Sequence, residues 1–147
     1  MKLFYIFALT LLFFSCNKRE ENAMKIAGVW DLTETVVTNY ENNKETGDSI
    51  VEQSGQLVFE VTGGLDNPCS HDINYAPCID NCFWDFPRKK EDQLFFYYYD
   101  EDVFSIYSSS CMVQRLTKNR LELLVVNYDN DLNIHKKTVW KFKRNKL

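Results

Sequence analysis

The sequence has no excess of basic side chains and little histidine. Its 147 residues include 17 Lys and Arg against 21 Asp and Glu, a net charge of −4 at pH 7, and two histidines. No basic stripe runs along the chain, so nucleic acid is not an expected partner. No Gly-x-Ser-x-Gly element, phosphate-binding glycine loop or zinc-binding helix motif occurs, and no Ser-His-Asp order stands out. We therefore expect a protein that is not an enzyme and that holds no cofactor or metal.

Long helical segments are also missing from the mature part of the chain. Without a helix long enough to act as a crossover, the strands must pair mostly antiparallel. Eight segments rich in β-branched and aromatic residues alternate with short polar turns. They are residues 29–40, 50–62, 82–86, 93–99, 103–108, 111–116, 121–128 and 133–144. Because closure removes exposed strand edges, the predicted fold is all-β, an eight-stranded antiparallel up-and-down β-barrel.

The first of these segments, residues 29–40, has a period of two. Most of its large apolar residues share one side of the predicted strand: Trp30, Leu32, Val36 and Tyr40. Polar residues, among them Thr35, share the other side. An alternation of this kind predicts a strand with one buried face. We therefore expect these four side chains to point into the barrel.

The first 15 residues are typical of a secretory signal peptide and are not expected to belong to the fold. Lys2 is followed by an apolar run over residues 3–14, and the small residue Ser15 ends it. This run is too short to span a bilayer as a stable helix, which argues against the alternative of a retained membrane anchor. Residues 1–15 are therefore predicted to be removed.

The end of this segment, Phe13-Phe14-Ser15-Cys16, resembles the lipobox of bacterial lipoproteins. The resemblance implies that Cys16 becomes the mature N-terminus and carries acyl chains, which anchor it stably to a membrane. Asn17 after the cysteine favours the outer membrane in such proteins. Residues 16–26 are then a lipidated N-terminus and tether. The expected location is the bacterial cell envelope, on the periplasmic or the cell-surface face of the outer membrane.

Four further cysteines predict two disulfide bonds, because the expected compartment is oxidising. They are Cys69, Cys78, Cys82 and Cys111. Three pairings are open from sequence alone. We favour Cys69–Cys78, which would pin the irregular loop over residues 63–81, and Cys82–Cys111, which would join two strands. A zinc site at Cys69, His71, Cys78 and Cys82 is less well supported, because its spacing lacks paired Cys-x-x-Cys elements.

The stretch Gly28-Val29-Trp30 resembles the start of the first strand in lipocalins and related calycin barrels. The resemblance implies a domain over residues 27–147 in which Trp30 closes one end of the barrel. It also implies a basic residue late in the barrel that packs over this tryptophan. Arg144 shares its side of the strand with Trp140, so it is the expected partner, with Lys143 as the alternative.

Aromatic residues crowd the segment at residues 93–99 on both sides of the predicted strand. Four aromatic residues are candidates for a ligand or partner surface: Trp84, Phe95, Tyr97 and Tyr99. Core packing beneath a covering loop would also explain them. The sequence thus supports two functions: a non-catalytic envelope lipoprotein that binds a small hydrophobic ligand, or a filled barrel that presents loops to another envelope or host protein.

Overall fold

The computed structural model describes residues 18–51, 54–62, 67–74, 76–77, 82–87, 90, 92–100, 105–129 and 134–146. The predicted signal peptide, the lipidation residue Cys16 and the loop residue Cys78 lie outside these ranges. Nothing in the structure therefore tests the signal peptide, the lipid anchor or a disulfide to Cys78.

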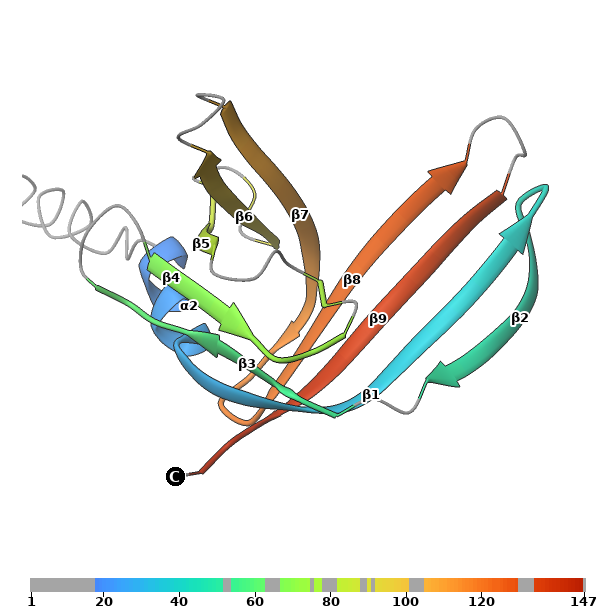
Figure 1. Ribbon diagram of the computed structural model, residues 1–147. Helices are drawn as coiled ribbons and strands as arrows, with labels where there is room; N and C mark the ends of the chain where they lie inside the picture. The colour runs from blue at the N-terminus through green and yellow to red at the C-terminus, as the bar shows by residue number, and fades with distance from the viewer. Residues whose placement is uncertain are drawn as a thin grey trace, which may run out of the picture.

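The described chain is one helix followed by nine antiparallel strands in a single closed sheet (Figure 1). The elements are α2 (Lys18–Ile26), β1 (Gly28–Glu41), β2 (Lys44–Val51), β3 (Gln56–Phe59), β4 (Asn67–His71), β5 (Cys82–Asp85), β6 (Gln93–Asp100), β7 (Ser105–Leu116), β8 (Arg120–Asp129) and β9 (Ile134–Arg144). Neighbours follow chain order from β3 to β9, and β9 pairs back onto β1. The eight strands β1 and β3–β9 therefore close into a ring, and β2 is an additional strand paired with β1. The predicted all-β, closed, eight-stranded antiparallel barrel is confirmed.

The single strand predicted over residues 50–62 is divided into two. β2 pairs with β1 from Thr35 onward, whereas β3 pairs with the beginning of β1, so the two share one edge of β1. Gly55 lies just before β3 with φ of +145°, and its carbonyl accepts a hydrogen bond from the amide of Leu32 at 2.9 Å. A Cβ at Gly55 would lie 2.7 Å from the Ile73 side chain. Glycine is therefore required where the strand changes direction.

Two further strand boundaries differ from the prediction. β4 lies inside the segment that was expected to be irregular, and it pairs with both β3 and β5. The three serines Ser108, Ser109 and Ser110 do not break a strand, because all three pair with β6 within the continuous β7. Cross-strand pairing has overridden the weak local preferences of these residues, as it commonly does in sheets.

A β-bulge at Thr33 reverses the inward and outward sides of β1. Leu32 pairs with Phe142 and Glu34 pairs with Lys141, so Thr33 is the extra residue. Its hydroxyl donates a hydrogen bond to the Lys141 carbonyl at 2.8 Å. An inserted residue shifts the alternation by one position.

The burial of β1 follows this shift. Trp30 and Leu32 are buried before the bulge, whereas Thr35 and Val37 are buried after it. The expectation that Val36 and Tyr40 point into the barrel was therefore wrong, because a period of two does not reveal a bulge.

The bulge divides the molecule into two regions. In the closed half, β3–β7 complete a ring with the first part of β1 and the adjoining parts of β8 and β9. One cluster of buried side chains fills this ring: Ile26, Trp30, Leu32, Leu57, Phe59, Cys69, Ile73, Cys82, Trp84, Phe86, Leu94, Phe96, Cys111, Leu121, Leu123, Trp140 and Phe142. Packing of this kind stabilises the ring by removing apolar surface from water.

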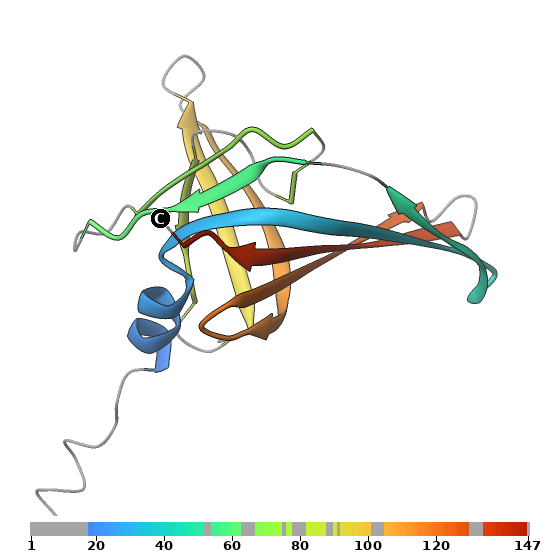
Figure 2. The same ribbon diagram turned by 90° about the horizontal axis from the view of Figure 1, so that it is seen from below.

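In the open half, the remaining part of β1 continues beyond the ring with β2, β8 and β9. These four strands form a sheet in the order β2-β1-β9-β8. In Figure 1 they run together away from β5 and β6, and Figure 2 shows β1 and β9 side by side along their length, with α2 at the closed end. The open half therefore exposes a sheet face that continues from the inner wall of the barrel.

No disulfide lies at bonding distance among the described cysteines. Cys69 and Cys82 pair directly opposite each other in β4 and β5 and approach to 4.3 Å, well above the 2 Å of a sulfur–sulfur bond. Cys111 belongs to β7, two strands away from Cys82, and it pairs with Leu94. Strand spacing of about 4.8 Å across two strands makes the favoured Cys82–Cys111 bond incompatible with this arrangement. The disulfide-pinned loop thus stays a prediction.

Candidate ligand site

The closed end of the barrel is fastened by a contact between its first and last strands. The Arg144 guanidinium lies over the Trp30 ring, 4.2 Å from the ring centroid. Trp30 is fully buried, and its indole Nε1 donates to the Ile26 carbonyl at 2.6 Å. A cation over an indole face is attractive through the quadrupole of the ring. The structure thus brings together two of the residues that the sequence associated with closure.

Arg144 also donates hydrogen bonds to three backbone carbonyls. Its Nη1 bonds to Ala27 O at 2.6 Å, its Nε bonds to Lys118 O at 2.7 Å, and its Nη2 bonds to Lys25 O. Burial lowers the pKa of this guanidinium from its ordinary value. Arg144 therefore ties the helix end, the first strand and the β7–β8 turn to one another.

Gly28 is the third residue of this contact. It has φ of +123°, and a Cβ there would lie 2.6 Å from Arg144 Nη1. A side chain at position 28 would displace the guanidinium and strain the backbone. The Gly-x-Trp pattern and the late arginine are therefore parts of one structural fastening at this end of the barrel.

Helix α2 lies against the same end of the barrel. Ile26 is fully buried in the core, and Arg19 forms two hydrogen bonds to the carboxylate of Asp85, at 3.0 Å and 2.5 Å. A bidentate pairing of this kind fixes direction as well as distance. The helix therefore begins at a defined position beside the closed half.

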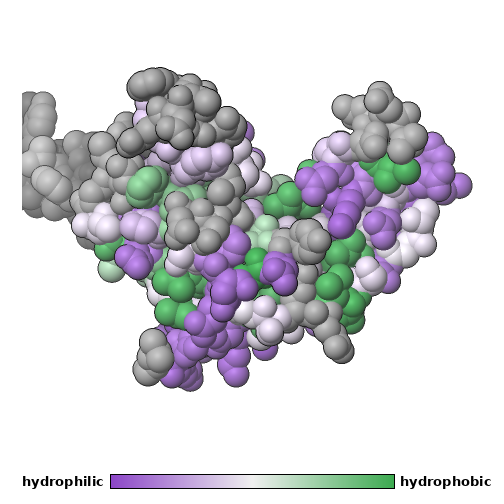
Figure 3. Space-filling model, in the orientation of Figure 1, coloured by the Kyte–Doolittle hydropathy of each residue, from purple (hydrophilic) through white to green (hydrophobic). Residues whose placement is uncertain are grey.

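A hollow of about 550 Å³ lies at the inner face of the open half. Its walls come from β1, β2, β8 and β9 on one side and from the segment between β4 and β5 on the other. The lining residues are Thr35, Val37, Val51, Ala76, Pro77, Val125, Asn127, Lys136, Thr138 and Trp140. Figure 3 shows the molecule hollowed between its two halves, with hydrophobic residues reaching into the notch. Small-molecule sites are commonly concave, mostly apolar and of this size.

The lining of the hollow changes from buried to exposed along β9. Trp140 lies at the inner end opposite Thr35, and both are buried. Thr138 follows, and Lys136 lies at the mouth opposite Asn127 of β8. Because residues two apart in a strand share a face, these three β9 side chains line the hollow in order.

The three tryptophans of the chain differ in their hydrogen bonding. All are buried, with exposed fractions of 0% for Trp30, 0% for Trp84 and 6% for Trp140. Trp30 Nε1 donates to Ile26 O, and Trp84 Nε1 donates to Glu60 O and Pro68 O. Trp140 Nε1 is buried and has no hydrogen-bond partner among the described residues. An indole N–H in a protein interior is usually paired, so this one is exceptional.

The aromatic surface predicted from the sequence is only partly present. Trp84 does not belong to it, because its ring is buried and packs edge-on against Phe59 and Phe86. Phe95, Tyr97 and Tyr99 share the outer face of β6, opposite the inward Leu94 and Phe96. We call Phe95, Tyr97 and Tyr99 the outer aromatic strip. Tyr99 is 51% exposed, and the ring of Tyr97 lies beside that of Phe83. Aromatic residues thus lie on both sides of β6: Phe96 belongs to the core, and the strip lies on the outer face.

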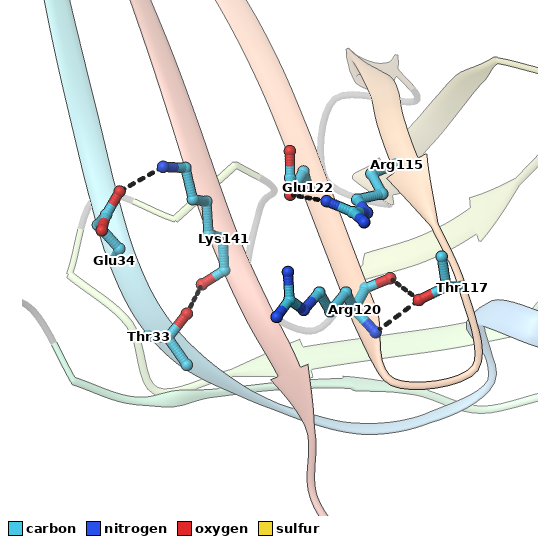
Figure 4. A network of polar contacts seen from close by, with 7 residues as sticks. All are labelled: Thr33, Glu34, Arg115, Thr117, Arg120, Glu122 and Lys141. Atoms are coloured by element: carbon cyan, nitrogen blue, oxygen red, sulfur yellow. Dashed lines mark hydrogen bonds and ion pairs between the residues drawn. The ribbon is translucent and has the colours of Figure 1, made fainter.

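A second, smaller hollow of about 430 Å³ lies on the outer surface near the closed end, lined mainly by charged residues of β8 and β9. Figure 4 shows the polar contacts around it. Lys141 pairs with Glu34 across β1 and β9, and Arg115 pairs with Glu122 at 3.6 Å. Two of its lining residues, Lys141 and Glu122, are thus already in ion pairs. Among the described residues, six charged ones line this hollow, whereas Lys136 is the one charged residue that lines the first.

Among the described residues, no group of three or more His, Cys, Asp or Glu side chains is placed to hold a metal ion. Over the same part of the chain, no helix is both long enough and apolar enough to cross a membrane. His71 lies in β4 and His135 in β9, so the two histidines belong to different strands that do not pair.

Sequence reasoning missed the residues of the hollow. The sequence predicted Trp140 only as a member of the last strand, and it did not single out Thr138 or Lys136. No local motif marks them, because they come together only when β1, β2, β8 and β9 extend beyond the ring. The one available signal is that the predicted segments at residues 29–40, 50–62 and 133–144 are longer than the other five.

No protein-family model matches the chain, and no curated protein matches it either. Among solved structures, the chain is similar to the S-type phycobiliprotein lyase CPES from Guillardia theta, with 7% sequence identity and a TM-score of 0.37. The similarity covers 87% of this chain and 93% of the lyase chain.

Proposed function

We propose that this protein is a lipid-anchored envelope lipoprotein that binds a small apolar molecule in the hollow of the open half. The observation that carries this proposal is the contrast between the filled ring and the hollow beside it. Five of the lining residues are aliphatic or proline, and Trp140 adds a large apolar ring: Val37, Val51, Ala76, Pro77 and Val125. A hollow of about 550 Å³ with a largely apolar lining favours an apolar ligand of modest size.

The proposed ligand site lies in the hollow of the open half and not at the centre of the barrel. The closed half is filled by its own aromatic and aliphatic side chains, including Trp30, Trp84 and Phe96, all fully buried. A ligand there would have to displace well-packed core residues, at a large cost in stability. The hollow needs no such displacement, since its walls are already apart.

The lipid anchor belongs to the same proposal. Acylation of Cys16 would attach the membrane two residues before α2, which begins at Lys18. The helix is fixed to the closed half through Ile26 and the Arg19–Asp85 pair. A tether at that position favours an orientation in which the closed end is near the membrane and the hollow is farther from it.

The binding proposal is tested by native mass spectrometry of the full-length protein purified in detergent, with and without N-phenyl-1-naphthylamine, an uncharged apolar probe. We expect one non-covalent adduct per chain. Val125→Trp fills the hollow and should remove the adduct, whereas Val126→Trp, on the opposite face of β8, should keep it. No adduct in the natural protein, or equal adducts in both variants, would contradict the proposal.

The anchor is tested separately by the intact mass of the same protein. We expect loss of residues 1–15 and an added mass of acyl chains on Cys16. A mass that retains residues 1–15 would show that the N-terminal proposal is wrong, without affecting the ligand site.

The outer aromatic strip supports a second candidate function, the presentation of a surface to another envelope protein. Tyr99 pairs with Ile106 of β7, and these neighbours are 51% and 72% exposed. Exposed apolar groups side by side are typical of contact surfaces. A photo-crosslinking residue at position 99 should then give a discrete protein adduct in envelope membranes, which Tyr97→Ser should reduce. Unchanged crosslinking in that variant would leave only the ligand-binding function.

A further inference from the structure

The geometry points to an elongated amphiphile as the ligand of the hollow. It would bind with an uncharged acceptor oxygen, such as a ketone or ester carbonyl, on Trp140 Nε1 and with an anionic group at Lys136. This inference rests on the proposed function and adds the chemistry of the ligand to it. Three observations carry it: the unpaired indole N–H, the apolar middle of the hollow, and the lysine at its mouth.

The inner end of the hollow calls for a hydrogen-bond acceptor. Trp140 is 6% exposed and lines the hollow, and within the described part of the chain its buried Nε1 has no hydrogen-bond partner. Leaving a buried donor unpaired costs about 1–3 kcal/mol. Trp30 and Trp84, the other two tryptophans, avoid that cost by bonding to backbone carbonyls. A hydrogen-bond acceptor on a ligand would pair the indole N–H of Trp140.

The acceptor at the inner end should carry no charge. Trp140 lies opposite Thr35 and two positions from Thr138, and both threonines are buried. None of these side chains is cationic. An anionic group placed among them would lose its hydration without gaining a counter-charge, which is strongly unfavourable. A carbonyl or ether oxygen can accept the indole hydrogen bond without that penalty.

The outer end of the hollow favours an anionic group. Lys136 is the one charged residue among the described residues that line the hollow. It is exposed and has no ion pair within the described part of the chain. In a protein whose net charge is −4, a lone cation at the mouth of an apolar hollow selects against cationic ligands and attracts anionic ones.

The separation of the two polar points sets the shape of the ligand. Trp140 and Lys136 lie four residues apart on one face of β9, which corresponds to roughly 13 Å along a strand. Between them lie the apolar side chains of Val37 and Val125 and the methyl group of Thr138. The ligand is thus an apolar chain or ring system that separates a buried oxygen from an exposed anion.

Three probes of equal length test this chemistry: a medium-chain fatty acid with a ketone near its far end, the same acid without the ketone, and the methyl ester of the keto acid. Each competes with N-phenyl-1-naphthylamine for the full-length protein, and the adducts are counted by native mass spectrometry. The natural protein should bind the keto acid about five- to tenfold more tightly than the plain acid, the usual effect of one hydrogen bond. It should bind the keto acid about two- to fivefold more tightly than the ester, as for an exposed ion pair.

Two substitutions separate the two contacts. Trp140→Phe should abolish the preference for the keto acid over the plain acid. Lys136→Met should abolish the preference for the keto acid over its methyl ester. Lys137→Met is the matched control, because Lys137 lies on the opposite face of β9 over the ring of Tyr40. It should change neither preference.

The outcomes distinguish this inference from the proposed function. If the naphthylamine probe binds but the natural protein shows neither preference, the inference fails and the apolar site stands. If Trp140→Phe keeps the ketone preference, the indole is not the donor and the inference again fails. If the naphthylamine probe itself does not bind, the proposed function is the part that is wrong.

Discussion

The closed and open halves of this protein use the same three long strands for different purposes. Up to Thr33, β1 has its large side chains in a packed ring that Arg144 fastens over Trp30. Beyond Thr33, β1 continues with β8 and β9 into a sheet that leaves a hollow of about 550 Å³. A single extra residue separates the two, because the bulge changes which side chains face inward.

The difference shows how a filled barrel can still present a site. A ring whose interior holds Trp30, Trp84 and several phenylalanines has no room for a ligand, but its long strands can extend beyond it. The two halves also differ in how their buried indole N–H groups are hydrogen-bonded. The closed half satisfies the indole donors of Trp30 and Trp84 internally, whereas the open half leaves that of Trp140 unsatisfied.

Trp30→Ala gives the largest expected effect, because it removes a fully buried side chain from the closed half. We expect a loss of about 3–5 kcal/mol in the free energy of unfolding, typical of a large aromatic residue truncated in a core. Urea unfolding of the purified protein measures it. A loss below about 1 kcal/mol would show that this end of the barrel does not depend on the tryptophan.

Arg144→Met should have the next largest effect. It keeps an apolar stem over the Trp30 ring but removes the hydrogen bonds to Lys25 O, Ala27 O and Lys118 O. We expect a loss of about 2 kcal/mol, since the guanidinium is only partly buried. Lys143→Met, one residue earlier on the exposed outer face, is the control and should change stability little. Equal losses in the two variants would mean that the fastening is not specific to Arg144.

The other two tryptophans permit a direct comparison of the halves. Trp84→Phe breaks hydrogen bonds to Glu60 O and Pro68 O, and should cost about 1–2 kcal/mol. Trp140→Phe breaks none, so we expect a smaller change, below about 1 kcal/mol. Thermal unfolding of the two variants, measured side by side, gives the order. A larger loss for Trp140→Phe would show that its N–H is already satisfied within the protein.

Lys136→Met should have the smallest effect on stability. The side chain is exposed at the mouth of the hollow and has no ion pair among the described residues. We expect the free energy of unfolding to change by less than about 0.5 kcal/mol, as for most surface substitutions. A clear loss in urea unfolding would assign Lys136 to the fold instead of to a ligand.

The closure of the barrel could be predicted from the sequence, whereas the hollow, β4 and the burial of Trp84 could not. Alternation and turn chemistry predicted the antiparallel barrel, and Arg144 packs over Trp30 in the structure, as the lipocalin resemblance implied. Local patterns carry this information because the core side of a strand must be apolar. The shift at Thr33 was missed, since a bulge inserts a residue without changing composition.

The hollow was missed for a different reason. Its residues come from four strands and a connecting segment, and each of them is unremarkable within its own strand. The sequence pattern of Trp140 is that of an ordinary core aromatic residue. Only the structure shows that its Nε1 has no hydrogen-bond partner among the described residues. The reverse error affected Trp84, whose place in an aromatic-rich stretch suggested a surface although its ring is buried.

Methyl NMR of the full-length protein in detergent micelles, with labelled valine and leucine, shows whether a ligand binds in the hollow or inside the ring. N-phenyl-1-naphthylamine is added in steps to the natural protein. Binding in the hollow predicts the largest shifts at Val37, Val51 and Val125, which line it, and small shifts at Leu57 and Leu94 inside the ring. The largest shifts at Leu57 and Leu94, or no shifts at all, would contradict it.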